Sequence, residues 1–341
     1  MNDRALKVLE QYELEIISTR RGRGSYICET TQGLKILCDY TGSENKALFQ
    51  NRIMQQIRDG GYEKVDMILP NKEGGLICED WEGSRYVVKD WYVGRECDTS
   101  NENEILAAVA NLARLHKLMH LSDETEFAKS FTAQPLVQEI AAQNAELQKV
   151  RSFMRKRTVR HDFERLFLSC FEQYFAQASE AEQKLRGIAL AFGAETDISG
   201  KKTAEKCTGK AKITSVCHGD YNHHHVLMSG YDIATTNFES CKFDYQINDI
   251  YRFMRKILEK HDWNPRLGMK MLERYTMQRP IGAQERRLLY IRMMYPEKFR
   301  KLANHYYGSN KAWISGRYLE KLENLNRQEE KRKNFVKMLE K

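Results

Sequence analysis

The residues with the clearest chemical potential lie in one short segment, CHGDYNHHHVL, at positions 217–227. It places His218 close to Asp220 and follows them with three consecutive histidines at 223–225. Imidazole nitrogens suit Zn, Ni or Cu, so the histidine run could form a transition-metal site. In a strand, however, consecutive side chains point to opposite faces, so only His223 and His225 would converge. An altered loop without a metal is the favoured interpretation.

Short strand-like stretches dominate the chain from residue 13 to about residue 92. They are ELEIIST, SYICETT, LKILCDY, KVDMIL, GLICED and RYVVKDWY, separated by turns that contain Gly, Asn or Pro. One helix is predicted at SENKALFQNRIMQQIRDGG, where Ser43 can cap the start and Gly60 can end it. This half is expected to be a small, mainly antiparallel sheet with one helix.

Helical periodicity replaces the strand pattern after Gly94 and continues to the C-terminus. The first helix predicted after Gly94 carries one apolar stripe, formed by Ile105, Val109, Leu112 and Met119. The exception is 213–243, where ITSVCHGD, HVLMS and DIATTNF predict short strands joined by tight loops. The lysine-rich stretch SGKKTAEKCTGKAK before them is expected to be an exposed loop.

Composition narrows the class of protein. The 341 residues carry 41% apolar side chains, enough for a sizeable core, and a modest net charge of +8 spread through the sequence. No apolar run approaches the ~20 residues that span a bilayer, and the N-terminus lacks a secretory pattern, so we expect a soluble protein made in the cytosol. The eight cysteines include no CxxC pair and are expected to be mostly reduced core residues. The basic clusters do not indicate nucleic-acid binding.

Three motifs follow one another in an informative order: His218-Gly219-Asp220, then TNFES, then DIYRFMRK. This order resembles the catalytic loop, the metal-binding strand end and the structural aspartate of aminoglycoside phosphotransferase-like and choline-kinase-like proteins. RGRGSYICETTQGLKIL, CHGDYN, FDYQINDIYRFMRKILEKHDW and the basic helical tail more narrowly resemble the CotS-type spore coat family, which shares that fold. The resemblance covers nearly the whole chain. It implies a bilobal α+β protein-kinase-like fold, with an N-lobe at 1–92 and a helical C-lobe at 93–341.

The resemblance implies roles for three residues. Asp220 aligns with the aspartate that orients the acceptor hydroxyl and takes its proton, because phosphoryl transfer depends on positioning and charge neutralisation. His218 would hold the loop, and Asp249, at the start of a helix, would brace the loop backbone. Asp220 and Asp249 could instead simply cap turns.

The sequence departs from the family pattern at both metal-binding positions. His225 stands where the resemblance implies an asparagine, and Asn237 stands where it implies an aspartate. Mg²⁺ prefers oxygen ligands that include a carboxylate, so imidazole and a neutral amide are poor substitutes. Glu239 could supply a carboxylate, since it lies on the same face as Asn237 if the strand continues.

The elements expected to hold nucleotide phosphates are also altered. Cys38 stands at the position of the strand lysine, and Lys35 has the opposite strand alternation, which makes it a doubtful replacement. Glu44 is the nearest helix partner for such a lysine, although it could serve only the helix dipole. Gly22 and Gly24 in RRGRG allow close approach to a phosphate, yet glycines at this spacing more commonly form a hairpin turn.

Three interpretations of function remain. The leading one is a noncatalytic, kinase-like scaffold or assembly factor of the spore coat, a pseudokinase whose partners are other coat proteins and whose binding of ATP and Mg²⁺ is weak or absent. The second is an active phosphotransferase with an unusual metal site, acting on a small hydroxylated or amino-sugar substrate. The third is nucleic-acid binding through the basic tail, which a solvated helix explains equally well.

Overall fold

The structure is a computed structural model that describes residues 3–22, 24–121, 127, 130–191, 214–230, 232–308 and 316–340. The chain forms two compact units. The first comprises Met1–Thr132, Thr214–Lys256 and Met269–Pro280, and the second comprises Ala133–Ile213, Ile257–Gly268 and Ile281–Lys341. This is a different division from the predicted lobes at 1–92 and 93–341, which stay a prediction.

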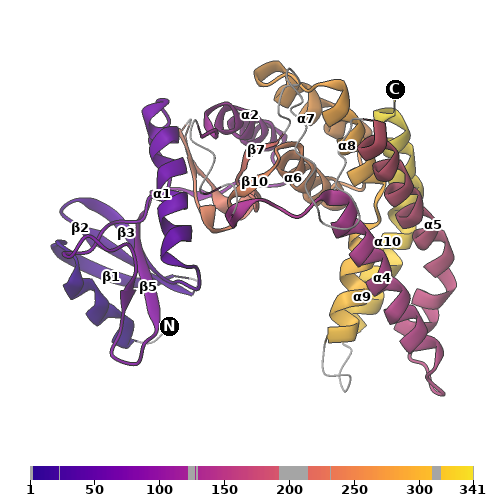
Figure 1. Cartoon of the computed structure of the whole chain (residues 1–341), viewed down its shortest axis with the longest axis horizontal. Coiled ribbons are helices and arrows are strands. Elements are labelled where there is room, and N and C mark those ends of the chain that lie inside the picture. The colour runs from indigo at the N-terminus through magenta and orange to yellow at the C-terminus, as the bar shows by residue number, and fades with distance from the viewer. Residues whose placement is uncertain are drawn as a thin grey trace. The chain divides into compact units, whose positions relative to one another are not determined.

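A five-stranded antiparallel sheet forms the N-terminal part of the first unit (Figure 1). Its strands lie in the order β1-β2-β3-β5-β4. Their bounds are β1 Ile16–Gly22, β2 Ser25–Thr30, β3 Gly33–Asp39, β4 Cys78–Glu79 and β5 Arg85–Asp90. The prediction of a sheet-rich N-terminal part is therefore confirmed.

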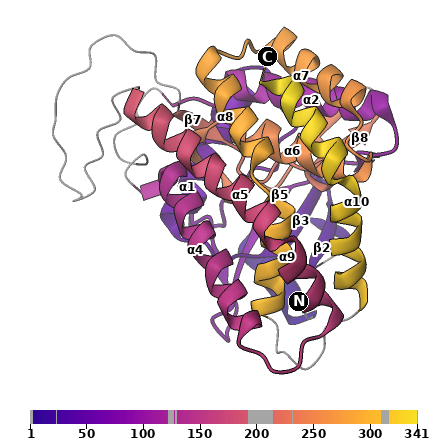
Figure 2. The ribbon, with the colours of Figure 1, turned by 90° about the vertical axis from the view of Figure 1, so that its right-hand side faces the viewer.

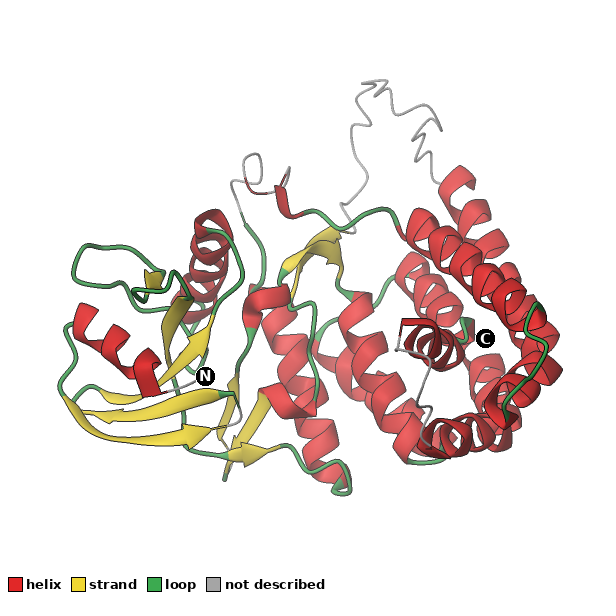
Figure 3. Cartoon of the chain, turned by 90° about the horizontal axis from the view of Figure 1, so that it is seen from below, coloured by secondary structure: helices red, strands yellow, loops and turns green. Residues whose placement is uncertain are grey.

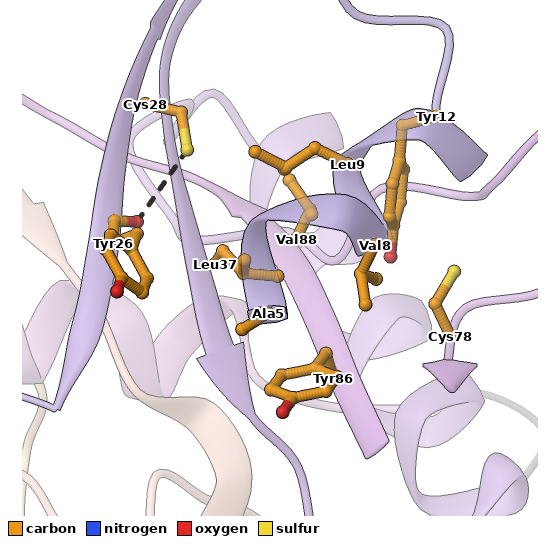
Figure 4. Packing of buried hydrophobic residues seen from close by; sticks show 10 residues of the cluster. All are labelled: Ala5, Val8, Leu9, Tyr12, Tyr26, Cys28, Leu37, Cys78, Tyr86 and Val88. Atoms are coloured by element: carbon orange, nitrogen blue, oxygen red, sulfur yellow. Dashed lines mark hydrogen bonds between the residues drawn. The ribbon is translucent and has the colours of Figure 1, made fainter. Parts of the chain in front are cut away.

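A 3₁₀ helix, η1 (Asp3–Gln11), covers one face of this sheet (Figure 4). Its apolar residues pack against the side chains of Leu37 on β3 and Val88 on β5. The packed residues of the helix are Ala5, Val8, Leu9 and Tyr12. No helix or strand was predicted for residues 3–11.

Helix α1 (Glu44–Asp59) belongs to a second cluster, on the other face of the sheet. Ser43 caps it by accepting a hydrogen bond from the amide of Lys46, as predicted, and Gly60 is its C-cap. Ala47 packs in one cluster with Val87, and Cys38 borders that cluster. Because side chains alternate along a strand, Leu37 and Cys38 of β3 face opposite sides.

The stretch KVDMIL at 64–69, predicted as a strand, is not one. Only isolated bridges form there, pairing Val65 with Thr235 and Ile68 with Lys89. The amide of Asn51 on α1 hydrogen-bonds both the N–H and the C=O of Ile68. A side chain thus takes the place of a strand neighbour and satisfies the backbone.

The rest of the first unit combines short sheets with helices. The helices include α2 (Glu102–Leu118) and most of α6 (Ile247–Lys260) and α7 (Pro265–Gln278). Strands β7 (Thr214–Cys217) and β10 (Lys242–Tyr245) pair with each other. Strands β6 (Arg95–Glu96), β8 (Val226–Ser229) and β9 (Asp232–Thr235) form a small sheet, and the turns η2 (His223–His225) and η3 (Phe238–Ser240) flank β8 and β9. The predicted short strands between 213 and 243 are therefore present.

Helices dominate the described part of the second unit (Figure 3). They are α4 (Leu136–Arg155), α5 (Asp162–Ala191), α8 (Ala283–Met294), α9 (Glu297–Gly308) and α10 (Gly316–Leu339). Helices α4 and α5 lie side by side (Figure 2), and stacked aromatic rings, such as those of Phe167 and Phe299, fill the interior. The predicted lysine-rich loop lies outside the described residues. Within the described ranges, no helix has the length and apolar character needed to cross a bilayer.

Candidate functional site

A cavity of about 890 Å³ lies in the first unit. Strands β1 to β3 form part of its wall, together with the segments that follow β7 and β9. Six of the candidate site residues named from the sequence line it, namely Gly22, Gly24, Cys38, Asp220, His225 and Asn237.

Asp249 anchors the loop 218–220 by accepting hydrogen bonds from its backbone. This carboxylate lies in the first turn of α6 and is completely buried. Its Oδ2 accepts the amide hydrogen of His218 at 2.7 Å, and its Oδ1 accepts that of Gly219 at 3.0 Å. Burial alone would raise the pKa of Asp249, but the contact with His116 and nearby charges hold it below its usual value. Asp249 therefore braces two consecutive backbone amides.

His218 is a buried connector. Its Nε2 lies 3.0 Å from the carbonyl oxygen of Thr236, and its Nδ1 accepts the amide hydrogen of Asp220 at 3.3 Å. These two contacts are satisfied together when Nε2 carries the hydrogen. Burial lowers the pKa of His218 to about 4, so the ring is neutral near pH 7.

His116 extends this network and was missed by the sequence reasoning. Its Nε2 lies 3.2 Å from Oδ2 of Asp249, and its Nδ1 lies 2.6 Å from the hydroxyl of Tyr275. The signal was available, because His116 is four residues after Leu112 on the apolar stripe of the predicted helix. A histidine on a buried stripe requires polar partners, and here they are Asp249 and Tyr275.

Asp220 lies on the cavity wall with its side chain 41% exposed. Its Oδ2 is 3.3 Å from Nε2 of His225, and its Oδ1 is 3.7 Å from Nζ of Lys256. Partial burial would raise the pKa of Asp220, but His225 and Lys256 hold it well below its usual value. Asp220 is therefore ionised at neutral pH.

His225 lies between Asp220 and Asn237. The same Nε2 atom that approaches Asp220 lies 2.9 Å from Nδ2 of Asn237. Residues 223–225 form a 3₁₀ turn and not a strand, so the predicted convergence of His223 with His225 was based on the wrong geometry. His224 instead contacts Glu96, at 2.5 Å. No cluster of three potential metal ligands of the His, Cys, Asp or Glu type occurs within the ranges given above.

Asn237 adopts a left-handed backbone with φ of 66°, which ends the strand before Glu239. The strand does not continue to Glu239, so the condition for placing Glu239 on the face of Asn237 is not met, and the 3₁₀ turn η3 positions Glu239 instead. The amide of Asn237 donates to Oδ2 of Asp66 at 2.8 Å. Burial raises the pKa of Asp66 to about 6.

Lys89 is a second residue of the site that was not predicted from the sequence. It lies on β5 with its side chain 5% exposed, and its Nζ lies 2.7 Å from Oε1 of Glu239 and 3.8 Å from Oδ2 of Asp66. Burial would lower the pKa of Lys89, but the two carboxylates raise it above its usual value. The signal in the sequence was a lysine inside the apolar strand RYVVKD, where a charge requires a buried partner.

The other predicted phosphate-binding residues are arranged differently. Lys35 forms an ion pair with Asp90 at 2.7 Å and lies outside the lining of this cavity. Glu44 is exposed in the first turn of α1 and does not line it either. Cys38 does line it, and burial raises the pKa of its thiol to about 12. The structure therefore brings Cys38 to the cavity and leaves Lys35 and Glu44 elsewhere.

The fold is that of a known class of phosphotransferases. An aminoglycoside phosphotransferase from Alicyclobacillus acidocaldarius matches with a TM-score of 0.80 at 15% identity, over 98% of this chain and 95% of that chain. The amicoumacin kinase hAmiN matches with a TM-score of 0.60 at 14% identity, over 98% and 94%. The choline kinase LicA from Streptococcus pneumoniae matches with a TM-score of 0.53 at 12% identity, over 96% and 97%. The chain thus has the protein-kinase-like α+β fold of aminoglycoside phosphotransferases and choline kinases, as predicted.

The sequence also assigns the chain to one particular family of proteins. The model described as "Spore coat putative kinase YutH" matches residues 6–339, so the chain belongs to this CotS-like family of spore coat proteins. No curated protein matches the sequence. The predicted resemblance to spore coat proteins is confirmed.

Proposed function

We propose that this kinase-like spore coat protein acts as a scaffold or assembly factor and that its cavity does not carry efficient phosphoryl transfer. The observation that best supports the proposal is the position of His225. Its imidazole lies within hydrogen-bonding reach of both Asp220 and Asn237. The resemblance to phosphotransferases implies that, in those proteins, the residues at the positions of His225 and Asn237 bind Mg²⁺.

The donor set in this space does not fit Mg²⁺. Magnesium demands near-octahedral oxygen coordination, and His225 offers a nitrogen while Asn237 offers at best a neutral amide oxygen. The nearby carboxylates of Asp66 and Glu239 already surround the ammonium of Lys89. Without a metal, the charge that develops during phosphoryl transfer is poorly neutralised.

The residues that hold the loop keep complete hydrogen-bond networks. Asp249 accepts both loop amides, and His218 links the loop to Thr236. A scaffold needs a stable surface and not a working metal site. This contrast between intact bracing and altered charge handling supports the scaffold over the enzyme.

We further propose that the protein is made in the mother-cell cytoplasm and incorporated into the spore coat, where other coat proteins are its partners. The family assignment supports this location. Nucleic acid is not proposed as a partner, because the C-terminal helix α10 mixes charges that pair within it, such as Lys333 with Glu330.

The test uses Asp220→Asn, which preserves size and most hydrogen bonding. A scaffold with this substitution should reach wild-type amounts in purified coat extracts, while an enzyme loses ~10²–10⁴ in rate when its general base is removed. The amount of each variant in the coat is measured beside its soluble level in the mother cell. Absence of the wild-type protein from the coat would contradict the spore assignment. Failure of a stably folded Asp220→Asn protein to incorporate would contradict the scaffold.

One observation favours a second function, an ATP-dependent phosphotransferase for a small hydroxylated or amino-sugar substrate. Asp220 is ionised and partly exposed on the cavity wall, as a base for an acceptor hydroxyl must be. Turnover of ATP at ordinary kinase rates of ~1–100 per second would establish this function. We expect turnover by the wild-type protein to be undetectable.

A further inference from the structure

Lys89 occupies the cavity face from which a strand lysine was expected. In the antiparallel pair of β3 with β5, Lys89 lies directly opposite Ile36. Residues opposite each other share a face, and Cys38 is two residues from Ile36, so Lys89, Ile36 and Cys38 face the same side. All three line the cavity. Strand β5 therefore supplies the ammonium of Lys89 on the face where β3 has only the thiol of Cys38.

The partners of Lys89 differ in how firmly they are held. Asp66 is 3% exposed and accepts the amide hydrogen of Asn237 at 2.8 Å, so its position is fixed. Glu239 has a side chain that is 39% exposed at the cavity. Glu239 is therefore the partner that can turn away and give up its place to another anion.

The cavity has the two kinds of wall that a nucleotide needs. Ile27, Leu34 and Leu227 provide apolar surface for a base. Arg20, Lys89 and Lys256 provide cationic groups around the same space. Its volume of about 890 Å³ suits a ligand of this size.

We propose that Lys89 is the phosphate-contacting lysine of this cavity and that the cavity binds a nucleoside diphosphate without a divalent cation. This inference rests on the proposed function, in which the positions around His225 do not hold Mg²⁺. Lys89 takes the role expected of a lysine at the position of Cys38. The positive charges of Arg20, Lys89 and Lys256 take the place of the metal's charge. Glu239 occupies the phosphate position when the ligand is absent.

The proposal gives opposite effects for two neighbouring substitutions. Lys89→Met removes the phosphate contact and should weaken ADP binding by about tenfold or more. Glu239→Gln removes the competing carboxylate and should tighten ADP binding by about fivefold. Lys35→Met is the matched control on the opposite face of the sheet, and it should leave ADP affinity unchanged.

The experiment is a calorimetric titration of the full chain with ADP, once in EDTA and once with excess Mg²⁺. We expect equal affinities in both buffers for the wild-type protein. Because Lys89→Met strands the buried Asp66, the double variant Lys89→Met/Asp66→Asn is titrated as well, with circular dichroism to confirm folding.

Three results would overturn the inference: no binding of ADP by the wild-type protein, binding only with Mg²⁺, or wild-type affinity in both Lys89 variants. A decrease in affinity on Glu239→Gln would overturn the role given to Glu239. None of these results bears on coat incorporation, which is measured separately. Conversely, loss of the Asp220→Asn protein from the coat would contradict the scaffold without touching Lys89.

Discussion

The Nε2 atom of His225 lies 3.3 Å from Oδ2 of Asp220, on the wall of the cavity. The same nitrogen lies 2.9 Å from the side-chain amide of Asn237. A ring nitrogen cannot donate to one group while it accepts from another. Because Asp220 is anionic, a hydrogen on Nε2 satisfies it best, and Asn237 then turns its amide oxygen toward the ring. The imidazole thus links the loop after β7 to the turn after β9.

Replacing His225 and Asn237 should make ATP binding depend on Mg²⁺. We expect His225→Asn combined with Asn237→Asp to supply oxygen ligands and to give ATP binding that requires Mg²⁺. In thermal-shift titrations, saturation at a hundredfold excess over the dissociation constant adds ~2.7 kcal/mol to the free energy of unfolding. His224→Asn is the control, since His224 contacts Glu96. An Mg²⁺-dependent shift already present in the wild-type protein would refute the altered-site interpretation.

Asp249→Asn should destabilise the first unit. Asparagine offers one acceptor where Asp249 accepts from both His218 and Gly219, and its own NH₂ then faces a backbone donor. Leaving a buried donor unpaired beside a lost charge costs ~3 kcal/mol. Urea denaturation measures the change, with the exposed Asp232→Asn as control. Equal midpoints for the two variants would show that Asp249 does not brace the loop. We also expect less Asp249→Asn protein in the spore coat.

Gly219→Ala tests the close approach of the loop to η3. Gly219 has φ of 83°, and a Cβ there would overlap the carbonyl oxygen of Ser240. We expect a loss of about 3 kcal/mol in the free energy of unfolding. Gly230→Ala is a matched control with φ of 62° and open space around the added carbon, and it should cost only about 1 kcal/mol. A loss at position 219 no larger than at position 230 would argue against the close approach.

His218 should make stability depend on pH. Its pKa is lowered to about 4 in the folded protein, whereas an unfolded histidine titrates near ~6.5. Between these values the unfolded chain binds more protons, so stability falls as pH decreases from ~6.5 to about 4. The shift corresponds to about 3 kcal/mol in total. Asp66, whose pKa is raised to about 6, acts in the opposite direction over part of the same window.

The measurement is the urea midpoint of the wild-type protein and of His218→Gln across this pH range. Glutamine retains a donor for Thr236 but does not titrate. We expect a smaller decrease in stability at acidic pH for His218→Gln. Equal slopes for the two proteins would show that His218 does not control this pH response.

Local sequence signals were enough for most of the architecture, although they missed η1 and wrongly predicted a strand at 64–69. Alternating apolar residues marked the strands β1, β2, β3 and β5, and Ser43 marked the start of α1, because both signals depend on neighbours in the chain. The order of His218-Gly219-Asp220, Asn237 and Asp249 was enough to predict the fold. Strand alternation also predicted that Lys35 and Cys38 face opposite sides of the sheet, and this holds because the two residues lie on one strand.

Tertiary structure alone decided the electrostatics of the cavity. Lys89, Asp66 and Glu239 come from three separate segments, and only folding brings the ammonium of Lys89 to 3.8 Å from Asp66 and 2.7 Å from Glu239. His225 contacts Asn237 across 12 residues because 3₁₀ turns replace the strand geometry that alternation assumes. Strand periodicity fixes which side a residue faces along one element. It contains no information on which distant charges will share a low-dielectric space, and that choice determines the pKa values and ligand preferences of this site.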